Sequence, residues 1–588
     1  MRRIWTVVAT LVAAILVITL ADRFVLIELL GQRVGEPLVL ACVEATAIAG
    51  AGFLARRLRG DAALNFVIGY PLFGTICFLV GLLRVSVWTM LPIVLVLAVA
   101  GVYSFMREAR SRKIDPATNL ATPEAGNLAT ATFLRDYALI AIAIVLVCGF
   151  IAAQAPPASL DELAYHLAIP HTWVVEGRAI ALPLISHSYF PLGIESADLP
   201  LISALGAFGG GVASHFLHFI AAIATIVLVW RTSRRNLLLT AAIATTPALA
   251  LTAGWSLVDW PLLGIFVALT AALLDDDEPT TAAAIAAGLL TKYTFIPFGI
   301  VALAVTRKHR GAVTGAIAGS VFFIRNLVLT GNPIAPFFSA NAPHVAGYRE
   351  LVLASYIFDG RFIDESLGAS LMSGALFTTG ALGIAALLVA VLLFALAPSA
   401  RILVPFFGVA ATQAGKAVEQ RRVLRAILVV AIAAQLMLVG YFIDRTELFS
   451  TMSGKWSDEE YLANARSSYP SIAWVNATVP EKSRTLVIGL NETYWFARSV
   501  RGGGNFDGPR MSAYLDAATP EALRLRLSRD GITHVAVFAA PPPTAVAQKV
   551  AERQTVLTAS AKRSLAQLLD LYASNVTAHG SVTLFTLR

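Results

Sequence analysis

Long apolar runs, separated by short polar and basic segments, occupy the chain from its N-terminus to about residue 445. Many of them extend for about 20 residues, the length that an α-helix needs to cross the roughly 30 Å hydrocarbon core of a bilayer. The pattern predicts an α-helical polytopic membrane protein with about 11–13 spans. We place spans near residues 4–21, 37–55, 63–83, 86–105, 134–154, 211–230, 236–253, 261–274, 312–329, 374–396 and 424–443.

Two apolar stretches do not fit a single simple span. The stretch from 281 to 306 is interrupted by the polar residues 291–294, which predicts two short helices meeting at a turn. The run 401–412 is too short to cross the core comfortably. Because Lys416 and three arginines follow this run, we expect it to stay on the inner side as a re-entrant or interfacial segment.

Composition agrees with a membrane protein. The 588 residues are 57% hydrophobic and 14% charged, with a mean hydropathy of +0.72, whereas soluble domains carry about 25% charged residues. The net charge of +8 comes from short basic clusters beside apolar runs, so it indicates topology and not nucleic-acid binding. The three cysteines lie inside apolar runs, which argues against a disulfide framework.

The basic clusters also orient the chain and divide it into parts. Placing Arg56, Arg59 and Arg231 inside the cell puts the loop 155–200 outside. Beyond the last span the composition becomes ordinary, with two strand-like runs and a helix-like stretch between them, which predicts a small extracytoplasmic α/β domain. The predicted parts are N-terminal helices and a linker over 1–133, a catalytic membrane core over 134–345, further helices over 346–445 and the α/β domain over 446–588.

Two adjacent acids, Asp161 and Glu162, open the first outer loop. A carboxylate there could take a proton from a hydroxyl group or bind a divalent cation. The alternative is that Asp161 caps a helix that starts at Glu162. Asp259, at the outer end of a later span, has the same two interpretations.

Other polar residues are expected on the same side. His166 shares a helix face with Glu162, but the histidine spacing matches no closed zinc pattern. Lys292, Tyr293 and Arg325 are predicted to lie at outer span ends, where they could bind a phosphate group or simply extend toward the membrane surface. The acidic run 275–278 is predicted to be a solvated helix start on the inner side.

Four segments, taken in order, resemble the C-type (GT-C) integral-membrane glycosyltransferases, especially bacterial relatives of protein mannosyltransferases and aminoarabinose transferases. The resemblance covers roughly residues 130–340, and the order and spacing of the segments together are more specific than any one segment. They are Asp161–Leu167 with the later Tyr189–Pro191, then Leu257–Asp259, then Gly288–Thr294, then Phe323–Asn326 with Thr330–Phe338.

The resemblance implies the GT-C fold and an inverting transfer of a sugar from a polyprenyl-phosphate donor to an envelope lipid, glycan or protein. It implies that Asp161 is the catalytic base, with Glu162 as a second acid. It further implies substrate-binding roles for Tyr165, His166, Asp259, Lys292, Tyr293, Arg325 and Asn326, with a divalent cation as an open question.

Two other classes of protein remain open from the sequence. A transporter or lipid flippase could also use charged residues at span ends, although the chain shows no inverted repeat. A structural or assembly subunit of the cell envelope would account for the C-terminal domain without chemistry. Under the enzyme hypothesis the protein acts at the outer face of a bacterial plasma membrane.

Overall fold

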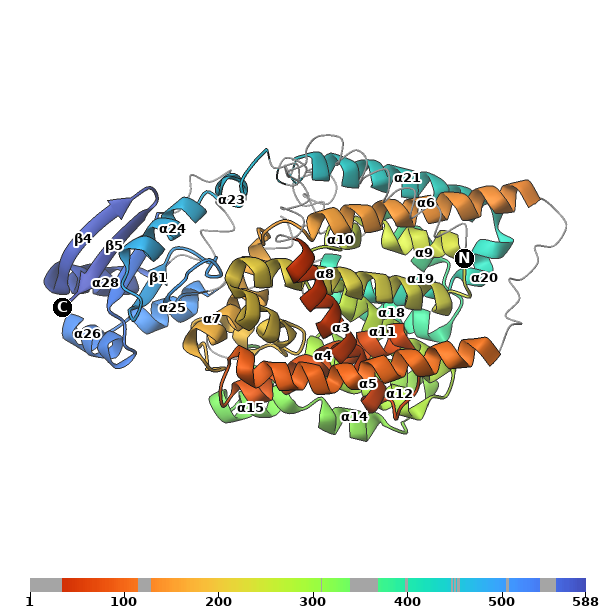
Figure 1. The fold of residues 1–588 in the computed structure, drawn as a ribbon, viewed down its shortest axis with the longest axis horizontal. Helices are drawn as coiled ribbons and strands as arrows, with labels where there is room; N and C mark the ends of the chain where they lie inside the picture. The colour runs from red at the N-terminus through yellow and green to blue at the C-terminus, as the bar shows by residue number, and fades with distance from the viewer. Residues whose placement is uncertain are drawn as a thin grey trace.

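The computed structural model describes residues 34–114, 128–307, 309–338, 368–396, 400–445, 455–503, 507–539 and 557–588, with Leu448 and Thr451. The predicted first span near 4–21 and most of the predicted second outer loop lie outside these residues. The described chain has a helical membrane part and a smaller α/β domain at one end (Figure 1).

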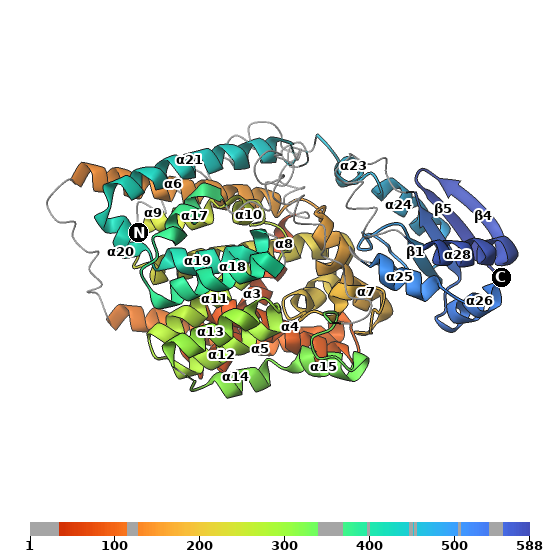
Figure 2. The ribbon, with the colours of Figure 1, turned by 180° about the vertical axis from the view of Figure 1, so that it is seen from behind.

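The membrane part is a bundle of helices (Figures 1 and 2). Within the described residues, six helices are long and apolar enough to cross a membrane, and the pair α14 and α15, bent by 50°, would make a seventh span. The bundle comprises α3 (Glu36–Ala55), α4 (Ala62–Gly81), α5 (Val87–Ile114), α6 (Leu128–Ala152), α7 (Ala168–Glu176), α8 (Leu199–Thr232), α9 (Leu237–Ala244), α10 (Pro247–Ala250), α11 (Asp259–Leu274), α12 (Glu278–Thr291), α13 (Phe295–Thr306), α14 (Ala312–Ala318), α15 (Val321–Thr330), α17 (Gly368–Leu376), α18 (Ala381–Leu396), α19 (Ala400–Thr412), α20 (Gly415–Gln420) and α21 (Arg422–Arg445). The predicted polytopic helical fold is confirmed.

Small residues bring the first helices into close contact. A Cβ atom placed on Gly50 of α3 would lie 1.9 Å from the carbonyl oxygen of Leu97 in α5, and one on Gly69 of α4 would lie 1.9 Å from that of Ile48 in α3. Helices in lipid associate mainly through such tight packing, because lipid tails are as apolar as the side chains themselves. These glycines therefore allow α3, α4 and α5 to pack at backbone distance.

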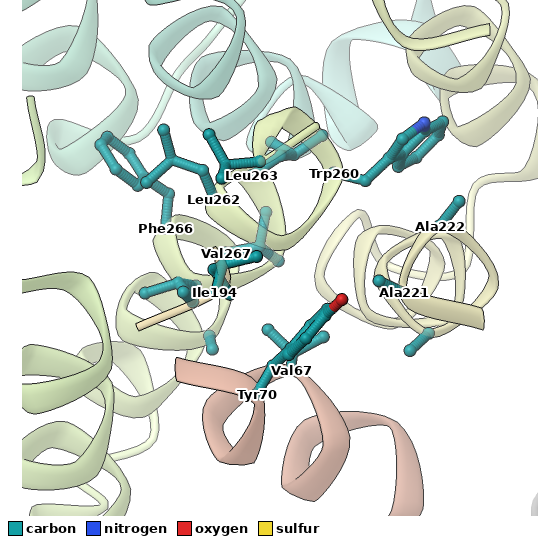
Figure 3. Close-up of a cluster of buried hydrophobic side chains, with 14 of the residues drawn as sticks. Val67, Tyr70, Ile194, Ala221, Ala222, Trp260, Leu262, Leu263, Phe266 and Val267 are labelled. Carbon is teal, nitrogen blue, oxygen red and sulfur yellow. The ribbon is translucent and has the colours of Figure 1, made fainter. Parts of the chain in front are cut away.

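Helix α11 lies at the centre of the bundle. Trp260, Leu263 and Phe266 on this helix are buried at 0–1% exposure, and they lie among side chains of α4 and α8, including Val67 and Ala221 (Figure 3). The sequence of α11 is apolar on all sides, as expected for a helix that other helices surround. Its position fixes where its first residue, Asp259, is presented.

The two ends of the bundle differ in chemistry. At one end, called the basic end here, Arg59 pairs with Asp277 at 2.5 Å and Arg231 pairs with Asp61 at 2.8 Å. Asp61 and Asp277 also cap α4 and α12 by accepting backbone N–H groups, which stabilises a helix N-terminus. The acidic run 275–278 is thus a helix start, as predicted.

Two predictions about the spans were wrong. The predicted span 236–253 is broken into α9 and α10, because Pro247 follows Thr246 and cannot continue the hydrogen-bond ladder. The run 401–412 does not stay at the basic end. The last residue of its helix α19, Thr412, is near the basic end, because Gly415 just after it lies against Ser233. Arg401, at the start of α19, lies beside Asp259, which is at the other end of the bundle. Its 13 residues extend about 20 Å.

The predicted turn inside 281–306 and the C-terminal α/β domain are confirmed. Helix α12 ends at Thr291 and α13 begins at Phe295. The domain has a five-stranded sheet in the order β2-β1-β3-β5-β4, with β1 parallel to β2 and β3, and β5 antiparallel to β3 and β4. Its elements are α23 (Asp458–Ala465), α24 (Tyr469–Thr478), β1 (Arg484–Ile488), β2 (Ser499–Arg501), α25 (Gly508–Leu515), α26 (Pro520–Arg529), β3 (His534–Phe538), α28 (Ala559–Tyr572), β4 (Ala573–His579) and β5 (Val582–Leu587).

Candidate active site

Four charged residues meet at the end of the bundle opposite the basic end, which we call the site end. Asp161 lies in the loop after α6, Asp259 is the first residue of α11, Lys292 follows the last residue of α12 and Arg401 lies at the start of α19. Each residue stands where a helix starts or ends, so the packing of the bundle determines their spacing. The segments that carry them are far apart in the sequence.

Arg401 joins the two predicted acids. Its Nη2 lies 2.8 Å from Asp259 Oδ2, and its Nε lies 3.4 Å from Asp259 Oδ1, which makes a two-point contact. Its Nη1 donates to Asp161 Oδ2 at 2.9 Å. The side chains of Asp259 and Arg401 are 4% and 12% exposed, whereas that of Asp161 is 28% exposed. Asp259 therefore anchors Arg401, and Arg401 holds the more accessible Asp161.

The other oxygen of Asp161, Oδ1, makes no hydrogen bond or ion pair with the described residues. The alternative interpretation of Asp161 as a helix cap is wrong, because its side chain accepts no capping hydrogen bond. Lys292 lies in extended backbone between α12 and α13, and it interacts electrostatically with Asp259, Asp161 and Arg401. Its ammonium group makes no hydrogen bond or ion pair within the described part of the chain.

Glu162 has different surroundings from its neighbour. It is 0% exposed, accepts the backbone N–H groups of Ser159 and Ser256 at 3.0 and 2.6 Å, and lies 2.8 Å from His215 Nε2. Burial alone would raise the pKa of its carboxyl, but His215 and the two N–H groups outweigh burial and lower it. These contacts tie the loop to α8 and to the segment before α11. A direct catalytic role for Glu162 stays a prediction.

Tyr165 and His166 line the same region. His166 Nδ1 lies 2.9 Å from Glu195 Oε1, and its Nε2 has no partner among the described residues. The Tyr165 ring stacks on His187 with centroids 4.1 Å apart. Burial lowers the pKa of His187 to about 4 and that of His166 well below its ordinary value, so both rings are neutral at pH 7.

Tyr293, Arg325 and Asn326 are brought together, but they bind the protein's own backbone. Arg325 Nη1 donates to the Ser188 carbonyl oxygen at 2.6 Å, and Asn326 Nδ2 donates to that of Tyr189 at 2.6 Å. The Tyr293 hydroxyl lies 3.0 Å from the Tyr189 carbonyl oxygen and accepts from Asn326 Nδ2 at 2.9 Å. These three side chains hold the first loop in place, and their predicted contact with substrate stays a prediction.

Arg401 was not predicted from the sequence as part of this region, whereas His215 and Glu195 were placed near it without an assigned role. No local signal marked Arg401, since an arginine directly before a run of apolar residues commonly extends toward the membrane surface. We took it as part of an inner segment. The described residues contain no group of three or more His, Cys, Asp or Glu side chains able to hold a metal ion. Asp161 and Asp259 share Arg401, and a divalent cation stays the open question that it was from the sequence.

Comparison with known proteins yields structural likeness only. No protein-family model and no curated protein sequence matches the chain. Two crystal structures of ArnT from Cupriavidus metallidurans are similar to it, one bound to undecaprenyl phosphate and one in the apo state. They are 14% and 13% identical to the chain, with TM-scores of 0.44 and 0.48, and each match covers 78% of this chain and 98% of ArnT. The activity of the chain therefore has to be argued from its own residues.

Proposed function

We propose that the chain is an inverting membrane glycosyltransferase of the GT-C type, which moves a sugar from a polyprenyl phosphate to an envelope acceptor at the outer face of the membrane. The observation that carries the proposal is the group of two carboxylates and two cations at the site end. It contains a carboxylate oxygen and an ammonium group that have no partner within the described residues. The motif resemblance of residues 130–340 supports the same reaction.

In the proposed reaction, Asp161 Oδ1 accepts the proton of an acceptor hydroxyl while the hydroxyl oxygen attacks the anomeric carbon. The bond from that carbon to the phosphate oxygen breaks, and polyprenyl phosphate leaves with the electron pair. Attack from the side opposite the leaving group inverts the anomeric configuration.

Lys292 and Arg401 supply the positive charge that the leaving phosphate needs. Negative charge grows on the phosphate oxygen as the bond breaks, and cations aimed at that position stabilise the transition state. Lys292 has no hydrogen-bond or ion-pair partner within the described residues, whereas Arg401 is held by Asp259 with a two-point contact that fixes the plane of its guanidinium group. The supported arrangement is thus a base next to a phosphate-binding pair.

The test compares membranes with equal amounts of wild type and the Asp161→Asn variant. Each is given a panel of short-chain polyprenyl-phosphate sugars with an envelope extract as acceptor source, and release of free polyprenyl phosphate is measured. We expect release by wild type and a fall of about 10²–10⁴-fold in Asp161→Asn, the usual contribution of a general base.

The control is Asp275→Asn, an exposed acid at the C-terminal end of α11. This variant should match wild type in amount and in release. If wild type releases no polyprenyl phosphate from any donor in the panel, the transferase proposal is wrong. Transport of labelled lipid by reconstituted protein would then test the flippase alternative.

A further inference from the structure

The short turn that carries Asp161 is held at both ends by the C-terminal α/β domain. On one side, Arg466 Nε donates a hydrogen bond to the Ala158 carbonyl oxygen. On the other, the backbone N–H groups of Thr493 and Tyr494 donate to the Leu163 carbonyl oxygen at 2.8 and 3.2 Å. We call residues 158–163 the catalytic turn. Asp161 lies between the two points of attachment.

The attachment points on the domain belong to one connected unit. Glu492 lies 3.3 Å from Arg466 Nη1 and accepts a hydrogen bond from Ser468 Oγ at 2.7 Å. Thr493 and Tyr494 directly follow Glu492, in the segment 489–498 between β1 and β2. This segment leaves the carboxyl end of β1, and its N–H groups hold the end of the catalytic turn at Leu163.

The contact is also apolar. Leu163 and Leu167 of the loop share one buried cluster with Tyr494, Trp495 and Phe538 of the domain. Tyr494 is 0% exposed, and its hydroxyl donates to the Ala207 carbonyl oxygen in α8. Domains that meet through polar surfaces alone are expected to move relative to each other, whereas a shared apolar core opposes such motion.

Rigid attachment matters because the Asp161 side chain has few contacts of its own. Its carboxylate is held only through Arg401 within the described residues. The position of the free oxygen is then set by the backbone of the catalytic turn. A displacement of about 1 Å of a reacting group can lower a rate by roughly 100-fold.

We propose that the C-terminal domain positions Asp161 for catalysis, with Arg466 and the segment 489–498 as the positioning elements. The proposal rests on the proposed glycosyl transfer for its effect on turnover. The position of the turn itself can be measured without turnover, so the two proposals can fail separately.

The first variant is Arg466→Gln, which removes the charge and the Nε donor to Ala158. We expect kcat to fall by about 10–100-fold with KM for the donor unchanged, because the base is displaced while Lys292 and Arg401 are intact. The matched control is Arg501→Gln. Arg501 also joins the domain to the loop, through Glu176 at 3.0 Å, but it does not contact the catalytic turn. We expect this control to keep kcat.

The second measurement is hydrogen exchange of the backbone amides of residues 158–167 in full-length protein in lipid nanodiscs. We expect the exchange rate of these amides to rise about tenfold in Arg466→Gln and to stay unchanged in Arg501→Gln. A tenfold rise means that the free energy of local opening is about 1.4 kcal/mol lower. If exchange and kcat of Arg466→Gln match wild type, or if both variants change equally, the positioning proposal is wrong.

A double variant separates positioning from charge. In Arg466→Gln/Glu492→Gln, no unpaired carboxylate remains, but the bond to Ala158 is still lost. We expect kcat and exchange to stay as in Arg466→Gln alone. Recovery in the double variant would mean that an unpaired Glu492 caused the loss, and it would overturn the proposal. If wild type shows no turnover, the exchange comparison still decides whether the domain holds the turn.

Discussion

The central prediction concerns Arg401, the residue that joins the two acids of the site. Replacing it in Arg401→Gln leaves Asp259, at 4% exposure, without its counter-ion. Breaking a buried ion pair by removing one partner costs about 3–5 kcal/mol, whereas the contact with the more exposed Asp161 adds at most about 1 kcal/mol. We therefore expect a loss of about 3–5 kcal/mol in the free energy of unfolding, almost all of it from Asp259.

The assay is thermal unfolding followed by a thiol-reactive dye in a Cys42→Ala/Cys148→Ala background, because Cys42 is exposed and Cys148 partly exposed, whereas Cys77 is fully buried and becomes reactive only on unfolding. At roughly 2–4 °C per kcal/mol for a large domain, the midpoint of Arg401→Gln should fall by about 6–20 °C. The double variant Arg401→Gln/Asp259→Asn no longer has the buried Asp259 carboxylate that Arg401→Gln alone leaves without its counter-ion. It should recover most of the loss, because removing both partners costs much less than removing one.

Activity separates the two roles of Arg401. If it also stabilises the leaving phosphate, the double variant should recover stability but not release of polyprenyl phosphate. The reasoning is refuted if Arg401→Gln unfolds at the wild-type temperature. The same conclusion follows if adding Asp259→Asn to Arg401→Gln lowers the stability by as much as Asp259→Asn does in the wild type, because the two side chains would then act independently.

Three further predictions test other parts of the structure. Lys292→Met should lower kcat/KM for the donor by about 10–100-fold, because a cation that stabilises the leaving phosphate is lost, without lowering the unfolding temperature, because this ammonium group has no hydrogen-bond or ion-pair partner within the described residues. An unchanged kcat/KM in steady-state assays would argue against phosphate binding by Lys292. Gly50→Val should lower the unfolding temperature in the same dye assay, because its Cβ would lie 1.9 Å from the Leu97 carbonyl oxygen; Gly440→Val, where a Cβ meets nothing within 4 Å, is the control. Burial would raise the pKa of Glu176, but Ser499, Arg501 and Arg484 outweigh burial and lower it from its ordinary 4.5. The contacts of Glu176 should therefore stabilise the domain fully above pH 4.5, and this stabilisation should be lost as the pH falls through the lower pKa of the folded state. Limited proteolysis from pH 7 to 3 measures this loss, and Glu176→Gln should make the rate of cleavage less dependent on pH.

The fold class followed from local pattern because a membrane makes that pattern strict. Each backbone polar group inside lipid has to be satisfied within its own segment, so an apolar run of about 20 residues predicts a helix with little competition. The turn at Lys292 and the strands β1 and β3 were also predictable, because a break in apolar periodicity and a short apolar run are both local signals.

The position of α19 in the bundle was not predictable in the same way. The rule that basic residues mark the inner side treats every arginine as a topology signal. Lys416 and the arginines after it follow one end of α19, but Arg401 at the other end is held by Asp161 and Asp259. No local pattern distinguishes a buried counter-ion from a surface anchor.

Local patterns along the chain predicted a helical membrane protein with a small α/β domain, and they located the acids and the lysine of the candidate site. Folding of the whole chain set the contacts of these residues. It joined Asp161 and Asp259 through Arg401, turned Tyr293, Arg325 and Asn326 onto the loop backbone, and placed the C-terminal domain on the catalytic turn. Hydrophobic periodicity depends on residues that are neighbours in sequence, whereas ion pairs and hydrogen bonds depend on which helix ends meet in space.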